Sequence, residues 1–216
     1  MMSILFALAT TCQAPIIELP ATGRPGDRFA VMLTGDGGWR RIDKRVTDGL
    51  RAEGIPIVGF LASSYFRTRR TPEESSCALA HIVRSYKERW NKAKVILIGY
   101  SRGADVLPFM INRLSRDVRD SIQLVALLGL EPSIDFEYEP TWTFGHYMHH
   151  HVQYPVLPEA QKMRGMNVLC IYGVKEKDTL CTHLDPLQFK ILREPGGHHF
   201  AGRYSEVTEA ILNAAR

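Results

Sequence analysis

The sequence predicts an α/β fold in which a mostly parallel sheet carries helices on both faces. Apolar runs rich in β-favouring residues alternate with stretches whose apolar residues recur at helical spacing. The chain has 216 residues, of which 45% are hydrophobic and 23% charged. These values fit one soluble domain with a substantial core.

The first predicted elements occupy residues 29–61. A strand at 29–34 ends in a glycine-rich loop at 35–39, and a further strand at 55–61 follows the next helix. That helix is predicted because apolar residues recur at every fourth position, namely Ile42, Val46 and Leu50.

A capping box predicts where the second helix begins. Thr71 serves as the N-cap, Pro72 fits the first helical position, and Glu74 completes the box. The core-facing stripe of this helix is made of large apolar residues: Leu79, Ile82, Val83, Tyr86 and Trp90. A strand beginning at Val95, another helix and a nearly all-apolar strand at 122–130 follow.

Residues 131–158 are the least regular part of the chain, with aromatic residues, prolines and four histidines but no clear period. We expect a short insertion over the site here. Regular elements return with predicted strands at 167–173 and 189–193 and a closing helix at 205–215.

The N-terminus resembles the tail of a secretory signal. Residues 1–9 are mostly apolar and end in a small-x-small triplet at 7–9, although no basic region precedes them. A buried first strand is the alternative. We therefore set residues 1–20 apart as an atypical or truncated signal-like segment, and residues 21–216 as a single domain. No apolar stretch reaches the roughly 18 residues of a membrane-spanning helix.

One short motif in the sequence is typical of a catalytic serine. Ser101 stands between Gly99 and Gly103, after a β-favouring run and before a helix-compatible stretch. This is the context of the Gly-x-Ser-x-Gly nucleophile elbow, in which glycines relieve crowding at a strained turn. The motif predicts a serine hydrolase or acyltransferase with an α/β-hydrolase-like fold and a small or absent cap.

A serine hydroxyl becomes a good nucleophile only when a general base takes its proton. That base, a histidine, is in turn oriented by a carboxylate, which also offsets its charge during the reaction. In this fold the partners follow in the chain order Ser, acid, His. We choose His198, directly after two glycines, as the base, with His199 as the fallback. We choose Asp178, just beyond the preceding strand, as the acid, while Glu176 and Asp185 stay possible.

The tetrahedral intermediate of such a reaction needs two backbone donors. One is expected from Arg102, the residue after the nucleophile. The other is expected from the early glycine-rich loop, at Asp36 or Gly37.

The four cysteines form no metal-binding spacing. Cys170 and Cys181 flank the predicted acid loop, so a disulfide between them would brace that loop and would require an oxidising compartment. Two separate buried thiols are the alternative.

Five blocks in order make this chain similar to a known family. They are residues 34–39, 69–73, 98–108, 170–173 with 177–178, and 195–200. The chain resembles the bacterial virulence protein VirJ/AcvB family from about Ala21 onward. Members are periplasmic α/β-hydrolase-like proteins linked to virulence and, in plant-tumour-inducing bacteria, to transfer of DNA and proteins. The family also includes hydrolases of aminoacylated phosphatidylglycerol.

The resemblance implies a triad of Ser101, Asp178 and His198. It implies a periplasmic serine esterase that cleaves the aminoacyl ester of an anionic lipid such as lysyl-phosphatidylglycerol through an acyl-enzyme, in a type IV secretion context. The chain departs from the family pattern at Arg102, where an aromatic residue is favoured, and in its histidine-rich insertion.

Several residues are expected to hold such a substrate. Guanidinium groups suit a phosphodiester, and an acidic residue would suit a lysyl group. The candidates are Arg67, Arg69, Arg70 and Arg102 for the headgroup, Asp36 or Asp105 for the amine, and Trp39 and Tyr100 beside them. A solvated basic face is the alternative for each arginine.

No cofactor or metal is expected. His146, His149, His150 and His151 lack the carboxylate or cysteine spacing of a zinc site, so they are interpreted as a surface loop. The net charge of +4 permits an anionic partner, and no direct nucleic-acid binding is expected. Two further functions stay open: a non-catalytic periplasmic protein that binds or escorts secretion substrates, with secretion-system components as partners, and a cytoplasmic thioesterase.

Overall fold

A seven-stranded sheet forms the centre of the protein in a computed structural model that describes residues 12–138 and 153–216. The strand order is β1-β3-β2-β4-β5-β8-β9, and every neighbouring pair is parallel except β1 with β3. The strands are β1 Ile16–Leu19, β2 Arg28–Leu33, β3 Ile57–Phe60, β4 Lys94–Tyr100, β5 Ile122–Leu128, β8 Val168–Gly173 and β9 Lys190–Glu194. The predicted mostly parallel α/β architecture is confirmed.

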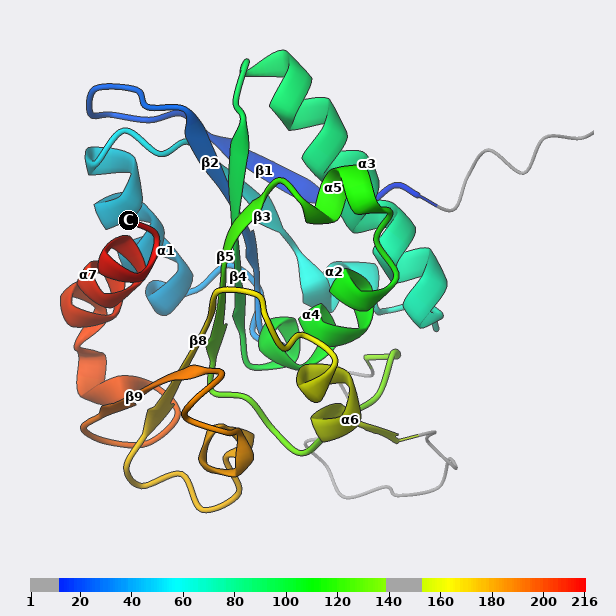
Figure 1. The fold of residues 1–216 in the computed structure, drawn as a ribbon, viewed down its shortest axis with the longest axis vertical. Helices are drawn as coiled ribbons and strands as arrows, with labels where there is room; N and C mark the ends of the chain where they lie inside the picture. The colour runs from blue at the N-terminus through cyan, green and yellow to red at the C-terminus, as the bar shows by residue number, and fades with distance from the viewer. Residues whose placement is uncertain (1–11, 139–152) are drawn as a thin grey trace, which may run out of the picture.

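Helices cover both faces of the sheet (Figure 1). α1 and α7 pack together on one face, and α3, α4 and α6 lie on the other with the short α2 and α5. Their bounds are α1 Arg41–Ala52, α2 Ala62–Tyr65, α3 Pro72–Arg89, α4 Arg102–Asn112, α5 Arg116–Arg119, α6 Val156–Gln161 and α7 Tyr204–Ala214. Two 3₁₀ helices, η2 Leu180–His183 and η3 Phe200–Gly202, lie near the C-terminal strands.

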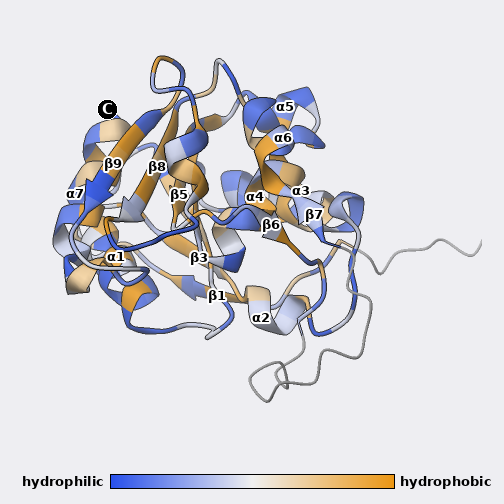
Figure 2. Cartoon of the chain, turned by 90° about the horizontal axis from the view of Figure 1, so that it is seen from below, coloured by the Kyte–Doolittle hydropathy of each residue, from blue (hydrophilic) through white to orange (hydrophobic). Residues whose placement is uncertain are grey.

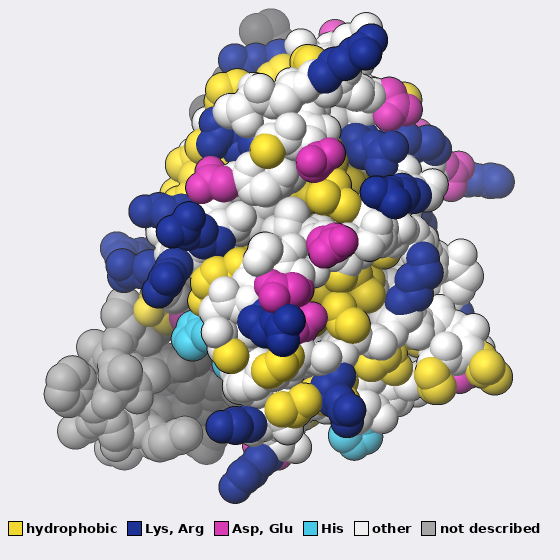
Figure 3. All heavy atoms as spheres, turned by 90° about the vertical axis from the view of Figure 1, so that its left-hand side faces the viewer, with side chains coloured by type: hydrophobic (Ala, Val, Ile, Leu, Met, Phe, Trp, Pro, Cys, Tyr) yellow, Lys and Arg dark blue, Asp and Glu magenta, His cyan; other side chains and the backbone are white. Residues whose placement is uncertain are grey.

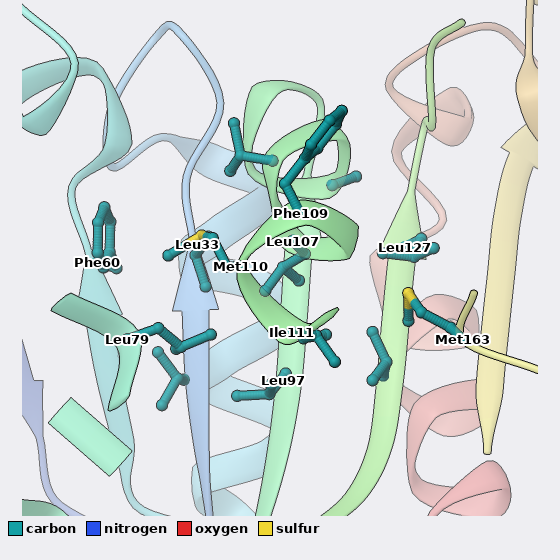
Figure 4. Close-up of a cluster of buried hydrophobic side chains, with 14 of the residues drawn as sticks. Leu33, Phe60, Leu79, Leu97, Leu107, Phe109, Met110, Ile111, Leu127 and Met163 are labelled. Carbon is teal, nitrogen blue, oxygen red and sulfur yellow. The ribbon is translucent and has the colours of Figure 1, made fainter. Parts of the chain in front are cut away.

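The core lies on both sides of the sheet because its central strands are apolar on both faces. Figure 2 shows these strands in orange, with hydrophilic residues on the outward sides of the helices. On the α4 side, residues of three strands and of α4 interdigitate, including Leu33, Leu97, Leu107, Met110 and Leu127 (Figure 4). Full burial of each such side chain stabilises the fold by about 1.5–3 kcal/mol.

The local sequence signals place most elements within one or two residues of the prediction. The capping box is present, because the Thr71 hydroxyl accepts from the Glu74 N–H at 3.1 Å and the Glu74 carboxylate accepts from the Thr71 N–H at 2.8 Å. The folded part begins before residue 21, since β1 pairs with β3 and Cys12 forms a disulfide with Cys77. The predicted boundary therefore falls too late. None of the helices in residues 12–138 and 153–216 could span a membrane.

The irregular segment is partly regular. β6 (Ser133–Ile134) and β7 (Tyr154–Pro155) form a small antiparallel sheet, and α6 follows directly. The histidines at 146–151 lie outside the described residues.

Candidate active site

Ser101 lies in the sharp turn between β4 and α4. Its backbone angles of φ +52° and ψ −124° belong to a region that costs a non-glycine residue about 1–3 kcal/mol. A Cβ atom on Gly99 would lie 2.3 Å from the Gly103 carbonyl oxygen, and one on Gly103 would lie 2.2 Å from that of Leu33. Only glycine fits either position, so the structure has the strand–turn–helix geometry that the motif predicts.

His198 is held by a carboxylate. Its Nδ1 lies 2.9 Å from Oε1 of Glu176, whose side chain is only 12% exposed. Gly129, which has φ +67°, makes room for the ring, because a Cβ atom there would lie 2.6 Å from His198 Cε1. The role of Gly129 was not predicted from the sequence. The feature that could have revealed it is a glycine directly after the apolar strand β5, which pairs with β4, the strand that leads to Ser101.

The carboxylate that contacts His198 is Glu176, which corrects the choice of Asp178. The loops after β8 and β9 press together, since Lys175 N–H donates to the Gly196 carbonyl at 2.8 Å. A turn closed by the Glu176 N–H and the Gly173 carbonyl points Glu176 back over the sheet edge. Asp178 lies two residues further on and is exposed to solvent.

Asp185 and His199 each have a partner away from the Glu176–His198 contact. Asp185 accepts from the Leu187 N–H at 3.0 Å within its own loop, and the carboxylate that contacts His198 is Glu176 instead. His199, the fallback base, contacts the Tyr100 hydroxyl through Nδ1 at 2.8 Å.

The hydrogen bond to Glu176 raises the pKa of His198 above its ordinary value, while burial of the ring acts in the opposite direction. A carboxylate that favours the imidazolium form is what a general base needs when it takes a proton from serine.

Two segments adjoin Ser101: the glycine-rich loop, where a Cβ atom on Gly35 would lie 3.1 Å from Ser101 Cβ, and the start of α4. Gly38 N–H donates to the Gly35 carbonyl at 3.0 Å, which closes the glycine-rich loop into a turn. Among the described residues, the N–H groups of Asp36, Gly37 and Arg102 have no protein acceptor. These are the groups from which the oxyanion hole is predicted to form.

Ser101 and His198 line one cavity of about 470 Å³. Its wall is built from residues 35–38, 40–43, 100–101, 198–199 and 204. Within the described part of the chain, Ser101 and His198 share this cavity without a direct hydrogen bond. A base that is out of contact in the free enzyme can still reach the serine when substrate binds.

The predicted substrate residues divide into three groups. Asp36 and Tyr100 line the cavity, as do two exposed arginines that sequence analysis missed, Arg40 and Arg41. The sequence feature that could have identified these two arginines is their position directly after the glycine-rich loop.

The second group, which includes Arg67, lies outside the lining of this cavity. Arg69 pairs with Glu137 at 2.8 Å, and the Arg70 guanidinium lies 4.8 Å from the centre of the Tyr65 ring. Trp39 is half-buried against Gly59 of β3. The structure therefore does not bring these residues to the cavity that Ser101 lines.

The third group consists of two predicted contacts that are buried inside the protein. Arg102 is 3% exposed and Asp105 is 2% exposed. Asp105 accepts from the Glu131 N–H at 2.8 Å, and burial raises the pKa of its carboxyl group. Neither side chain is available to a headgroup.

The predicted disulfide between Cys170 and Cys181 is present, with Cα atoms 5.7 Å apart. It ties β8 to η2 and closes the loop that carries Glu176. The second disulfide, Cys12–Cys77, ties the N-terminal segment to α3.

Charge on the surface is mixed. On the side of the molecule where α1 and α7 lie, Figure 3 shows basic side chains spread over the face with acidic ones among them. Residues 12–138 and 153–216 contain no group of three or more histidine, cysteine or acidic side chains arranged to hold a metal ion.

Comparison with protein families gives one match: the family described as bacterial virulence protein (VirJ) covers residues 27–216. The chain belongs to the VirJ family. This confirms the resemblance drawn from the sequence blocks. The comparison with curated proteins finds no match.

Solved structures similar to this VirJ family member are α/β hydrolases. MenH from S. aureus has a TM-score of 0.64 at 14% identity, over 92% of this chain and 97% of its own. Est1E from Butyrivibrio proteoclasticus, solved with ferulic acid, has a TM-score of 0.60 at 14% identity, over 91% and 92%. XC6422 from Xanthomonas campestris, described as an α/β serine hydrolase without lid, has a TM-score of 0.56 at 13% identity, over 94% of each chain. These likenesses establish the α/β-hydrolase fold.

Proposed function

We propose that this protein is a serine hydrolase that cleaves an ester through an acyl-enzyme. Ser101 Oγ attacks the carbonyl carbon as His198 takes its proton, and Glu176 stabilises the resulting imidazolium. His198 then returns the proton to the leaving alcohol, and a water molecule deprotonated by the same ring releases the acid. One observation carries this proposal: a strained serine and a carboxylate-bound histidine line the same cavity.

The developing oxyanion would be held by backbone donors. Arg102 supplies one N–H at the start of α4, where the helix dipole also favours negative charge. Asp36 or Gly37 supplies the other. A Cβ atom on Gly35 would lie 3.1 Å from Ser101 Cβ, so the glycine-rich loop lies directly against the nucleophile.

We further propose that the substrate is an aminoacyl ester of an anionic phospholipid, cleaved in the periplasm in a virulence or secretion context. Membership of the VirJ family supports the context. Arg40 and Arg41, both exposed at the cavity, support an anionic group beside the ester. The two disulfides support an oxidising compartment.

A fluorophosphonate probe tests the chemistry. Wild-type protein should be labelled and Ser101→Ala should not, with circular dichroism showing that both are folded. Absence of labelling in a folded wild-type sample would refute the enzyme and favour a binding or escort protein.

Vesicles containing lysyl- or alanyl-phosphatidylglycerol test the substrate. Release of the free amino acid by wild type, and none by Ser101→Ala, is the expected result. Turnover of p-nitrophenyl acetate without release from either lipid would refute the lipid assignment and leave the serine chemistry in place.

A further inference from the structure

The Arg102 side chain makes a set of contacts that the catalytic steps above do not use. Its Nε and Nη2 atoms both donate to the Asp36 carboxylate, the second at 3.5 Å, and Nη1 donates to the Asp135 carbonyl at 2.5 Å. The guanidinium carbon lies 5.9 Å from the Phe66 ring centre and 5.4 Å from that of Tyr138. Removing the partner of a guanidinium that is 3% exposed would leave a buried charge uncompensated, and Asp36 is the carboxylate that pairs with it.

The two residues joined by this ion pair are among those whose backbone N–H groups are proposed to form the oxyanion hole. The N–H of Arg102 is fixed by the first turn of α4. The N–H of Asp36 lies on a loop that contains three glycines within residues 35–38 and would otherwise have wide conformational freedom. The side-chain bridge therefore sets the distance between the two donors.

A second contact holds the same loop from the other side. Arg40 Nε donates to the Gly37 carbonyl at 2.6 Å, which orients the following peptide plane. The loop is thus held at two consecutive residues. Donors that are fixed before reaction stabilise an oxyanion without any cost of reorganisation.

We infer that Arg102 is a positioning residue: its guanidinium holds Asp36 so that the glycine-rich loop presents its N–H to the oxyanion. This inference rests on the proposed serine hydrolase chemistry. Arg102 does not bind the substrate, since its side chain is 3% exposed and its donors are engaged by Asp36 and Asp135. It acts on the transition state only through Asp36.

Asp36→Asn tests the inference, because it keeps the shape and the backbone N–H of the loop and removes the charge. With p-nitrophenyl acetate, kcat should fall about 10- to 100-fold while KM changes less than about threefold, since a misplaced oxyanion donor costs up to about 10²–10³ in rate. The inhibition constant of a trifluoromethyl ketone, whose adduct places an oxyanion in the same hole, should rise by the same factor as kcat/KM falls.

Arg69→Gln is the matched control. It breaks an exposed arginine–carboxylate pair with Glu137 on a neighbouring loop and should leave kcat and the inhibition constant unchanged. The double variant Asp36→Asn/Arg102→Gln should lose no more activity than the more affected single variant, because both act through one contact.

Two kinetic results would overturn the inference: a kcat for Asp36→Asn within twofold of wild type, or a rise in KM with kcat unchanged, which would make the pair a substrate contact. Hydrogen exchange of the Gly38 amide, which bonds to Gly35, separates this inference from the proposed function. Exchange should accelerate at least tenfold in Asp36→Asn but not in Arg69→Gln, even if the wild-type protein shows no labelling by the fluorophosphonate. Unchanged exchange would also refute the inference.

Discussion

Replacing Glu176 with glutamine tests which carboxylate supports the histidine. The amide matches the carboxylate in size but removes its charge, and its NH₂ group can turn toward Nδ1 and hold the ring in the wrong tautomer. Opposite unit charges about 4 Å apart attract by about 4 kcal/mol at an effective dielectric constant near 20. Glu176 is 12% exposed and His198 32% exposed, so some of this attraction is screened. A loss of about 3 kcal/mol corresponds to roughly 10²-fold in kcat/KM.

The assay is the rate of p-nitrophenyl acetate hydrolysis from pH 5 to 9. Asp178→Asn is the control: it removes a carboxylate two residues away in the same loop, and its activity should stay within twofold of wild type. The base must be neutral to accept a proton, so activity falls as the pH drops through the pKa of His198. Because Glu176 raises that pKa, the acid limb in Glu176→Gln should move to lower pH.

The reverse pattern would refute this reasoning. If Asp178→Asn lost two orders of magnitude while Glu176→Gln stayed active, the acid would be Asp178 after all. If both variants kept full activity with an unmoved acid limb, the contact between Glu176 and His198 would have no part in the reaction.

Three further changes test the surroundings of the site. Gly129→Ala should reduce kcat/KM at least tenfold while unfolding free energy falls by only about 1–2 kcal/mol, because the added methyl group occupies the place of the His198 ring; equal activity would refute this. Cys170→Ala with Cys181→Ala should cost about 3 kcal/mol in urea unfolding, as expected for a disulfide that spans 11 residues; no loss would show that the bridge adds nothing. Burial raises the pKa of Asp43 to about 6, so the unfolded chain loses this proton at lower pH than the native protein does. The contribution of Asp43 to the free energy of unfolding should therefore drop by about 1 kcal/mol as the pH rises from 5 to 7. Thermal unfolding of Asp43→Asn should lack this drop.

The fold could be predicted because its signals are local. The buried parallel strands are apolar runs, and α3 begins at a capping box whose residues also form it in the structure. The edge strand β1 was missed because Ile16–Leu19 is short and lies beside a segment that resembles a signal peptide.

The turn at Ser101 and the placement of His198 in the same cavity could also be predicted, since each residue is marked by glycines that a turn requires. The carboxylate that contacts His198 could not, because the loop after β8 offers two carboxylates and the choice depends on the path of that loop. That path is set by its packing against the next loop, where a Cβ atom on Gly173 would lie 2.2 Å from the Gly197 carbonyl oxygen. Sequence spacing holds no information about such a contact between loops.

The arginines that the sequence offers as one substrate-binding set have different partners in the structure. The buried Arg102 guanidinium pairs with Asp36, whose side chain is 46% exposed, and Arg69 pairs with Glu137 outside the cavity lining. Of the arginines at the cavity, Arg41 forms no ion pair within the described residues, and its side chain is exposed to solvent. Exposed ionic contacts are typically worth about 0–1 kcal/mol. Under the proposed function, headgroup charge therefore adds to binding at the rim, whereas the rate of the chemical step depends on the contact between Arg102 and Asp36, which solvent screens less because the guanidinium is 3% exposed.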